Sequence, residues 1–236
     1  MGTFIRYADG DQPLEGYFAA PRSKTARPGV LIAPTWMNVT PGLCARADRL
    51  AELDFAAFVA DALGAGVRPT PPQSPLAVIR PLMEDRVAYR QRLSAGLKVL
   101  KSRPECSPDF VAAIGYCFGG CGVLELARIG TPLRGVVSLH GVLTTSLPGE
   151  YGAIEAKILV LHGDADPVVP LETLLAFREE MRRARANWQI NVYSNASHGF
   201  TGEGSAGERT PEAVMHPQTE RRSWKAMITF LEEVLE

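Results

Sequence analysis

The sequence predicts an α/β fold in which a mostly parallel central sheet is covered by helices on both faces. Apolar runs of strand length alternate with amphipathic stretches of helix length along all 236 residues. The apolar runs at 110–114 and 158–161 lack polar alternation, which is typical of strands buried between two helical layers. No internal repeat or linker divides the chain, so we expect a single domain over residues 1–236.

The elements follow from local signals in chain order. Asp9-Gly10-Asp11 is the turn of an amino-terminal hairpin, and Pro104 follows the end of a long helix. The segment 64–81 is rich in proline and glycine, so we expect an irregular loop that is either an active-site wall or disordered. A second irregular loop is expected at 199–215. The expected strands are 4–6, 14–20, 29–33, 56–61, 110–114, 135–140, 158–161 and a short one from 190, and the expected helices are 43–53, 86–101, 118–128, 171–185 and 218–235.

A glycine-rich turn around Cys117 is the strongest chemical signal. Gly115-Tyr116-Cys117-Phe118-Gly119-Gly120 connects an apolar strand to a helix that starts near Phe118. This is the Gly-x-Ser-x-Gly nucleophile elbow with cysteine in the serine position. The glycines leave room where side chains would collide with the neighbouring strand and helix. The positive end of the helix dipole favours a thiolate over a thiol. The alternatives are a dinucleotide-binding turn and a cysteine that serves only as a small buried hydrophobe.

An acidic loop follows a later strand, as this fold requires. Residues 158–161 are apolar and lead into Asp164 and Asp166. Loops at the carboxyl ends of parallel strands line the crevice where ligands bind. Asp166 is the better candidate acid because Pro167 and Pro170 stiffen the chain after it, whereas Asp164 has the position of a turn or capping residue. The alternative is that both aspartates serve the turn and the helix start.

His198 completes the order nucleophile, acid, histidine that is expected of an α/β-hydrolase. It lies in a polar loop just after the short strand from 190, next to a glycine. His140 and His162 each end an apolar strand, and His140 is the better candidate for a contact near the site. His216 precedes Pro217 and is expected to be exposed.

Composition excludes several classes of protein. The formal net charge is −1, with 25 basic and 26 acidic residues, which does not suggest a nucleic-acid surface. No secretory signal or membrane-length apolar run is visible, and the cysteines show neither a disulfide framework nor a metal spacing. We therefore expect a cytoplasmic protein without cofactor, metal, nucleic-acid or membrane partner, either a monomer or a small homo-oligomer.

Four motifs together resemble one known family, the dienelactone hydrolases (carboxymethylenebutenolidases). They are the Gly-x-Cys-x-Gly-Gly elbow, His-Gly-Asp-x-Asp-Pro-x-Val-Pro at 162–170, His-Gly-Phe at 198–200 and Arg-Arg-Ser-Trp at 221–224. The resemblance extends from Gly29 to the carboxyl terminus. It implies a triad of Cys117, Asp166 and His198, and an oxyanion hole made by the backbone N–H groups of Trp36 and Phe118.

The chain departs from this family where substrate is recognised. Thr35 stands where family members that open dienelactones carry a glutamate, and Thr201-Gly202 stand where they carry one of two carboxylate-binding arginines. The other arginine is matched by either Arg80 or Arg86. The resemblance therefore implies an incomplete carboxylate site. The candidate substrate-binding residues are Thr35, Arg86, His140 and Phe200.

The residue types predict hydrolysis of a small ester or lactone. A cysteine thiolate with a histidine base readily attacks such carbonyl carbons, and their oxygen leaving groups are easier to expel than an amine. A thioesterase or acyl transferase on the same fold is an alternative, for which Trp36, Phe118 and Phe200 would line an apolar acyl tunnel. A non-catalytic ligand-binding relative is a further alternative, although no triad member is missing.

Overall fold

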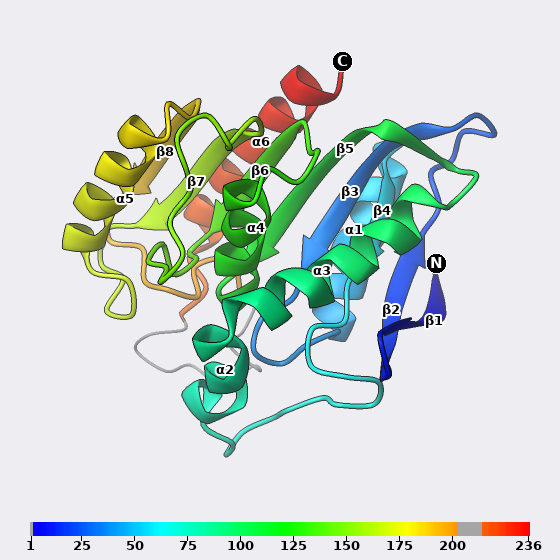
Figure 1. The fold of residues 1–236 in the computed structure, drawn as a ribbon, viewed down its shortest axis with the longest axis horizontal. Coiled ribbons are helices and arrows are strands. Elements are labelled where there is room, and N and C mark those ends of the chain that lie inside the picture. Colours follow the sequence, from blue (N-terminus) through cyan, green and yellow to red (C-terminus); the bar gives the residue numbers. More distant parts are fainter. Residues whose placement is uncertain (1, 203–213) are drawn as a thin grey trace.

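One eight-stranded sheet forms the centre of the molecule (Figure 1). The structure is a computed structural model that describes residues 2–202 and 214–236. The strands are β1 (Thr3–Asp9), β2 (Gln12–Ala19), β3 (Arg27–Ala33), β4 (Ala56–Val59), β5 (Cys106–Tyr116), β6 (Gly135–Leu139), β7 (Lys157–Gly163) and β8 (Trp188–Tyr193).

The strand order places the crevice of the sheet between β3 and β5. The order is β1-β2-β4-β3-β5-β6-β7-β8, and β2 pairs antiparallel with both β1 and β4. All pairs from β4 onward are parallel. The chain passes from β3 outward to β4 and then returns to β5 on the other side of β3. Such a reversal opens a crevice at the carboxyl ends of the two strands, where α/β proteins bind ligands.

Helices cover both faces of the sheet, as predicted (Figure 1). Side chains alternate along the buried strands, so that Leu31 packs with one helical layer and Ile32 with the other. The first layer contains α3 (Arg86–Lys101), α4 (Phe118–Arg128) and α5 (Leu171–Arg183), and the second contains α1 (Pro41–Glu52) and α6 (Pro217–Leu235). The mostly parallel α/β architecture with helices on both faces is therefore confirmed.

The segment 64–81 is less irregular than predicted, because its last part begins the helix α2 (Pro75–Glu84). Ser74 caps this helix by accepting a hydrogen bond from the Ala77 N–H at 3.4 Å. Pro75 occupies the first turn, where a missing N–H leaves no hydrogen bond unmade. Its apolar side is half-buried against the core next to α3. The many prolines of this segment predicted an irregular loop, whereas the structure has a capped amphipathic helix.

Two other expectations concern the end of the chain. His216 is half-buried rather than exposed, because its Nδ1 accepts a hydrogen bond from the Thr219 N–H at 3.3 Å and caps α6. Of the irregular loop expected at 199–215, residues 203–213 lie outside the described residues. Among the helices that the structure describes, none has the length and apolar character needed to cross a membrane.

Candidate active site

Cys117 lies at a sharp turn between β5 and α4. Its backbone has φ 54° and ψ −116°, which is unusual for a residue with a side chain. A Cβ atom at Gly115 would collide with the carbonyl of Gly119, and one at Gly119 would collide with the carbonyl of Ala33 at the end of β3. The Cys117 N–H donates to the Leu139 carbonyl at 3.0 Å, which ties the turn to β6. The predicted elbow geometry is thus present, with the thiol half-buried at the amino end of α4.

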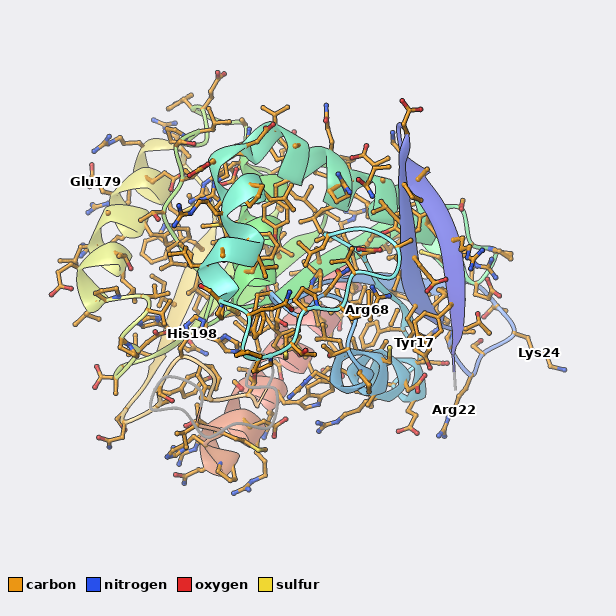
Figure 2. All side chains as sticks on the ribbon, turned by 90° about the horizontal axis from the view of Figure 1, so that it is seen from below. Tyr17, Arg22, Lys24, Arg68, Glu179 and His198 are labelled. Carbon is orange, nitrogen blue, oxygen red and sulfur yellow. The ribbon has the colours of Figure 1, made fainter. Side chains whose placement is uncertain are left out.

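His198 joins the candidate nucleophile to the candidate acid. Its Nε2 lies 3.0 Å from Cys117 Sγ, and its Nδ1 lies 2.9 Å from Asp166 Oδ2. The three residues come from the ends of β5, β7 and β8, which run parallel and finish at one edge of the sheet. Figure 2 is viewed from the side of the molecule at which β3 and β5 end, and His198 is labelled there.

The backbone after β7 distinguishes the two candidate aspartates. Asp166 is buried, and its Oδ1 accepts hydrogen bonds from Val168 N–H at 2.8 Å and Val169 N–H at 3.0 Å. These bonds leave Oδ2 directed at His198. Asp164 is exposed, and its backbone N–H donates to the Tyr193 carbonyl at 2.9 Å. Asp164 therefore has the turn position that the sequence predicted.

The surroundings of His198 stabilise its charged form. Burial by itself lowers the pKa of this imidazole, but the Cys117 sulfur and the Asp166 carboxylate outweigh burial and raise the pKa to about 10. An imidazole held between two acceptors of negative charge is most stable as imidazolium. The arrangement can therefore hold His198 as an imidazolium beside the Cys117 sulfur at neutral pH.

His140 lies directly beside this pair. Its ring centroid is 5.1 Å from that of His198, with the planes at 65°, and its Nε2 is 2.8 Å from Thr201 Oγ1. Burial lowers the pKa of His140 well below its usual value, and the neighbouring His198 lowers it further. Phe200 packs edge-on against the same ring at 5.1 Å.

The loop after β3 carries the first candidate oxyanion donor. Asn38 N–H donates to the Thr35 carbonyl at 3.0 Å, which closes a tight turn around Trp36. Asn38 has φ 62° and donates through Nδ2 to Asp61 Oδ1 at 2.6 Å, so the turn is tied to the end of β4. Thr35 is fully buried, and its Oγ1 accepts from the Met37 N–H at 3.3 Å.

The second candidate donor is Phe118, the first residue of α4. Its side chain is buried and stacks on Tyr89 with ring centroids 4.3 Å apart, and its carbonyl accepts from Tyr89 Oη at 2.9 Å. Gly119 brings the start of α4 against the end of β3, so the two donor segments adjoin. N–H groups in the first turn of a helix have no partner within the helix.

Arg86 is buried near α4 with weak hydrogen-bond acceptors. Its Nη1 donates to Cys121 Sγ at 2.8 Å and to Met83 Sδ at 3.1 Å, and its Nη2 reaches the Thr144 carbonyl at 3.5 Å. Its Nε has no partner among the described residues, and no carboxylate of the described residues forms an ion pair with it. Cys121 lies one turn beyond Cys117. The guanidinium charge therefore lies near the site, and residues 2–202 and 214–236 provide no carboxylate partner for it.

The sequence analysis did not identify Arg46 as a residue near the site. This residue of α1 donates from Nη2 to the Thr201 carbonyl at 2.7 Å and pairs with Glu220 of α6 at 3.4 Å. Its guanidinium also lies 5.0 Å from the centre of the Tyr116 ring. No motif surrounds Arg46, and its position becomes meaningful only once α1 and α6 pack on one face.

Metal ligands are not gathered at this edge. Within residues 2–202 and 214–236, no cluster of three or more histidine, cysteine, aspartate or glutamate side chains is arranged to hold a metal ion. The chemistry available to the described residues is that of a thiol, an imidazole, a carboxylate and backbone donors.

The elbow, the parallel sheet and the contacts among Cys117, His198 and Asp166 can be compared with those expected of known protein families. The model of the dienelactone hydrolase family matches residues 14–235. The chain belongs to the dienelactone hydrolase family. It is accordingly a hydrolase of the carboxylic ester type, as the four motifs predicted.

The chain is also similar in sequence to individual proteins. The chain is 38% identical over 147 residues to an uncharacterized protein of Caenorhabditis elegans. The match covers 61% of this chain and 92% of that protein. It is 22% identical over 208 residues to a carboxymethylenebutenolidase homolog of Xenopus tropicalis, covering 85% of this chain and 82% of the relative.

Two solved structures superpose over almost the whole chain. The structure named m3DLH is 36% identical with a TM-score of 0.94, covering 100% of this chain and 99% of its own. The crystal structure of P91, a dienelactone hydrolase-like promiscuous phosphotriesterase from metagenomic libraries, is also 36% identical, with a TM-score of 0.92 and the same coverage.

Proposed function

We propose that this dienelactone hydrolase family member cleaves small esters or lactones with Cys117 as nucleophile, His198 as acid and base, and Asp166 as the group that orients His198. The observation that carries the proposal is the position of His198 between Cys117 Sγ at 3.0 Å and Asp166 Oδ2 at 2.9 Å. A nucleophile, a base and an orienting carboxylate within hydrogen-bond reach are what covalent catalysis requires.

The first half of the reaction forms a thioester. The Cys117 thiolate attacks the carbonyl carbon, and the carbonyl oxygen becomes an oxyanion that accepts hydrogen bonds from the backbone N–H groups of Trp36 and Phe118. One such donor contributes about 2.7–4 kcal/mol to transition-state stabilisation in related chemistry. The C–O bond to the leaving group then breaks, and the His198 imidazolium donates a proton to the departing oxygen.

The second half releases the acid. With the sulfur in a thioester, the charge on Cys117, the larger of the two charges that raise the pKa of His198, is gone, and only Asp166 still raises that pKa. His198 can then be neutral and accept a proton from a water molecule that attacks the thioester carbonyl. The oxyanion forms again on the same donors, the C–S bond breaks and the thiolate pairs again with the imidazolium.

The candidate substrate-binding residues divide by burial. Thr35, His140 and Phe200 are fully buried, which favours roles behind the residues that touch substrate. Arg86 is 6% exposed and has no carboxylate partner among the described residues. We propose that Arg86 makes a single contact with an anionic group of the substrate where one is present.

Phosphotriester hydrolysis is a second candidate. It is favoured by the 36% identity over the full chain to the promiscuous phosphotriesterase P91. A thiolate paired with imidazolium can attack phosphorus as well as carbon, and the same backbone donors would face the phosphoryl oxygen. We propose it as a side activity of the same three residues.

Kinetics on a substrate panel tests both candidates. We would assay p-nitrophenyl esters, cyclic enol-lactones and an aryl dialkyl phosphate triester with the wild type, Cys117→Ala and the control Cys44→Ala. Cys44 is half-buried in α1 and lies near Tyr17 of β2. We expect Cys117→Ala to lose turnover of every substrate that the wild type hydrolyses, while Cys44→Ala retains it. Full activity of folded Cys117→Ala would contradict the nucleophile assignment.

Alkylation gives an independent reading. Iodoacetamide should label Cys117 before the other three cysteines, because burial raises the pKa of both the Cys106 and Cys121 thiols to about 11. Peptide mapping after addition of one equivalent of reagent measures the order. Labelling of Cys44 ahead of Cys117 would show that the elbow thiol is not the reactive one.

A further inference from the structure

The loop that carries His198 is hydrogen-bonded to His140, which directly follows β6. We call residues 198–202 the histidine loop. Within it, Thr201 Oγ1 lies 2.8 Å from His140 Nε2, and the Thr201 carbonyl accepts from Arg46 Nη2 at 2.7 Å. The same His140 ring lies edge-to-face with His198, at 5.1 Å between ring centroids. One imidazole therefore contacts both the candidate base and the loop that positions it.

The backbone of His140 is strained and firmly fixed. Its φ is 40°, in a region that residues with side chains rarely adopt because it is energetically unfavourable for them. Its N–H donates to the Leu161 carbonyl of β7 at 2.9 Å, while the carbonyl of the preceding Leu139 accepts from Cys117 N–H at 3.0 Å. His140 is thus tied to the strand ends on both sides of it. With the backbone held in this way, the His140 ring contacts Thr201 and His198 of the histidine loop.

The titratable groups around His140 disfavour a positive charge on its ring. His198, Arg46 and His162 face its ring from the histidine loop, α1 and β7, and each of them disfavours a positive charge there. The ring itself is fully buried. A neutral imidazole next to His198 adds no repulsion to the imidazolium that forms during turnover, whereas a cationic side chain in that place would.

We propose that His140, through its hydrogen bond with Thr201, is a positioning residue for the hydrolytic reaction: it fixes the His198 ring against Cys117. This inference rests on the proposed function, because it assigns His198 the acid–base role. An error of about 1 Å in the placement of a reacting group can cost about 100-fold in rate. His198 has to serve two proton transfers from one position, so its loop cannot drift.

The experiment is a double-mutant cycle on the hydrogen bond. We would compare His140→Phe, Thr201→Val and the double variant with the wild type, and include Thr201→Ser, which retains the hydroxyl. We expect each single variant to lower kcat about 10-fold to 100-fold with KM changed less than about threefold. The double variant should lose no more than the worse single, and Thr201→Ser should stay within about threefold of wild type. Losses that multiply in the double variant would overturn the proposal.

A second histidine–threonine hydrogen bond serves as a matched control. His216 Nδ1 lies 2.8 Å from Thr219 Oγ1 at the start of α6, the same distance as in the His140 pair. Among the hydrogen bonds of the described residues, His216 meets the histidine loop only through its backbone N–H, which donates to the Phe200 carbonyl at 3.0 Å, and Thr219→Val does not remove that group. Thr219→Val should lower the melting temperature as much as Thr201→Val does but leave kcat unchanged. If Thr219→Val reduced kcat as strongly as Thr201→Val, the effect would be one of general stability, and the positioning role would be wrong.

The pH dependence of alkylation separates this inference from the proposed function. Iodoacetamide reacts with the Cys117 thiolate whether or not any ester is a substrate. A displaced His198 ring stabilises the thiolate less, so the midpoint of the rate curve should move to higher pH in His140→Phe and Thr201→Val but not in Thr201→Ser or Thr219→Val. An unmoved midpoint in folded Thr201→Val overturns the positioning role. A shifted midpoint in an enzyme that hydrolyses no ester would leave it standing while the proposed function fails.

Discussion

Two buried histidines, His140 after β6 and His198 after β8, lie in contact with each other, and their pKa values are shifted in opposite directions. The pKa of His140 is well below its usual value, while the pKa of His198 is raised to about 10. Both rings are buried and their centroids are 5.1 Å apart. The difference comes from their partners. His198 has Cys117 Sγ and Asp166 Oδ2 on its two nitrogens, whereas His140 has the neutral hydroxyl of Thr201.

This comparison shows that burial alone does not set the charge of a side chain at this edge of the sheet. Burial lowers the pKa of both rings, and only a neighbouring negative charge reverses the direction. The neutral histidine can then serve as a fixed support and the charged one as a proton donor. Replacing a hydrogen-bond partner of one histidine should therefore change the pKa of that histidine more than the pKa of the other.

The largest effect is expected at Asp166, whose carboxylate acts together with the Cys117 sulfur to raise the pKa of His198. Asp166→Asn retains the shape but not the charge, and it can hold the imidazole in the wrong tautomer. We expect kcat to fall about 10³-fold to 10⁴-fold, as for the equivalent change in a serine protease triad. Asp164→Asn is the matched control, because this residue is exposed in the same loop. Steady-state kinetics on the best ester measures both, and comparable losses in the two variants would show that the loop rather than the charge is responsible.

A third buried basic group, Arg86, sharpens the comparison because it has no anionic partner among the described residues. A hydrogen bond to a charged group contributes roughly 1.5–3 kcal/mol, so a single contact corresponds to about a 10-fold to 100-fold preference. We expect Arg86→Met to lower kcat/KM for a substrate with a free carboxylate by that factor and to leave its methyl ester unaffected. Arg80→Met, in the exposed part of α2, should change neither.

The wild-type preference for the carboxylate over its methyl ester should be modest. A preference of about a thousandfold or more, or ~4 kcal/mol, would indicate a second cation at the site and contradict the incomplete carboxylate site.

The charged state of His198 should also limit activity at high pH. In the proposed reaction the imidazolium donates the proton to the leaving group, and its pKa is raised to about 10. Since this group is protonated below that value, kcat/KM should hold from neutral pH to about 9 and then fall about tenfold per pH unit above 10. A pH–rate profile measures the alkaline limb. A limb near pH 7 would mean that Cys117 and Asp166 do not raise the pKa of His198 in solution.

Much of this site could be predicted from the sequence, because its signals are local. The glycines around Cys117 and the prolines after Asp166 indicate the backbone conformation at the residue itself, and the bounds predicted for α3 and α4 agree with those of the structure. The hydrogen bonds that connect Arg46 and His140 to the histidine loop have no such local signal. Arg46 meets Thr201 across 155 residues, and His140 meets it across 61. Contacts of this kind arise from the packing of whole elements and leave no trace in spacing.

The helix α2 shows a second reason why prediction falls short. Prolines ordinarily end helices, so 64–81 was predicted to be irregular, yet Pro75 occupies the first turn of a capped helix. The capping Ser74 and the spacing of Ile79, Leu82 and Met83 carry the opposite signal. Where two local rules conflict, the half-burial of the apolar side against the core decides, and that contact depends on the whole fold.

The smallest effect is expected in the acid stability of the fold, where His140 and His198 should again differ. Because the pKa of His140 is lowered in the folded protein, the unfolded chain binds this proton first as pH falls through about 6.5. Stability is therefore lost toward acid, by about 0.7 kcal/mol between pH 7 and pH 6 for one such histidine. His140→Phe should remove this contribution. The unfolding free energy of the variant should therefore fall less between pH 7 and pH 6 than that of the wild type, whatever the substitution does to stability at pH 7 itself. Burial also lowers the pKa of His162, so His162→Phe should remove a second, similar amount. Urea unfolding at the two pH values measures both. If His140→Phe retained the full wild-type difference between pH 6 and pH 7, the His140 ring would not be neutral in the folded protein, and the contrast with His198 would fail.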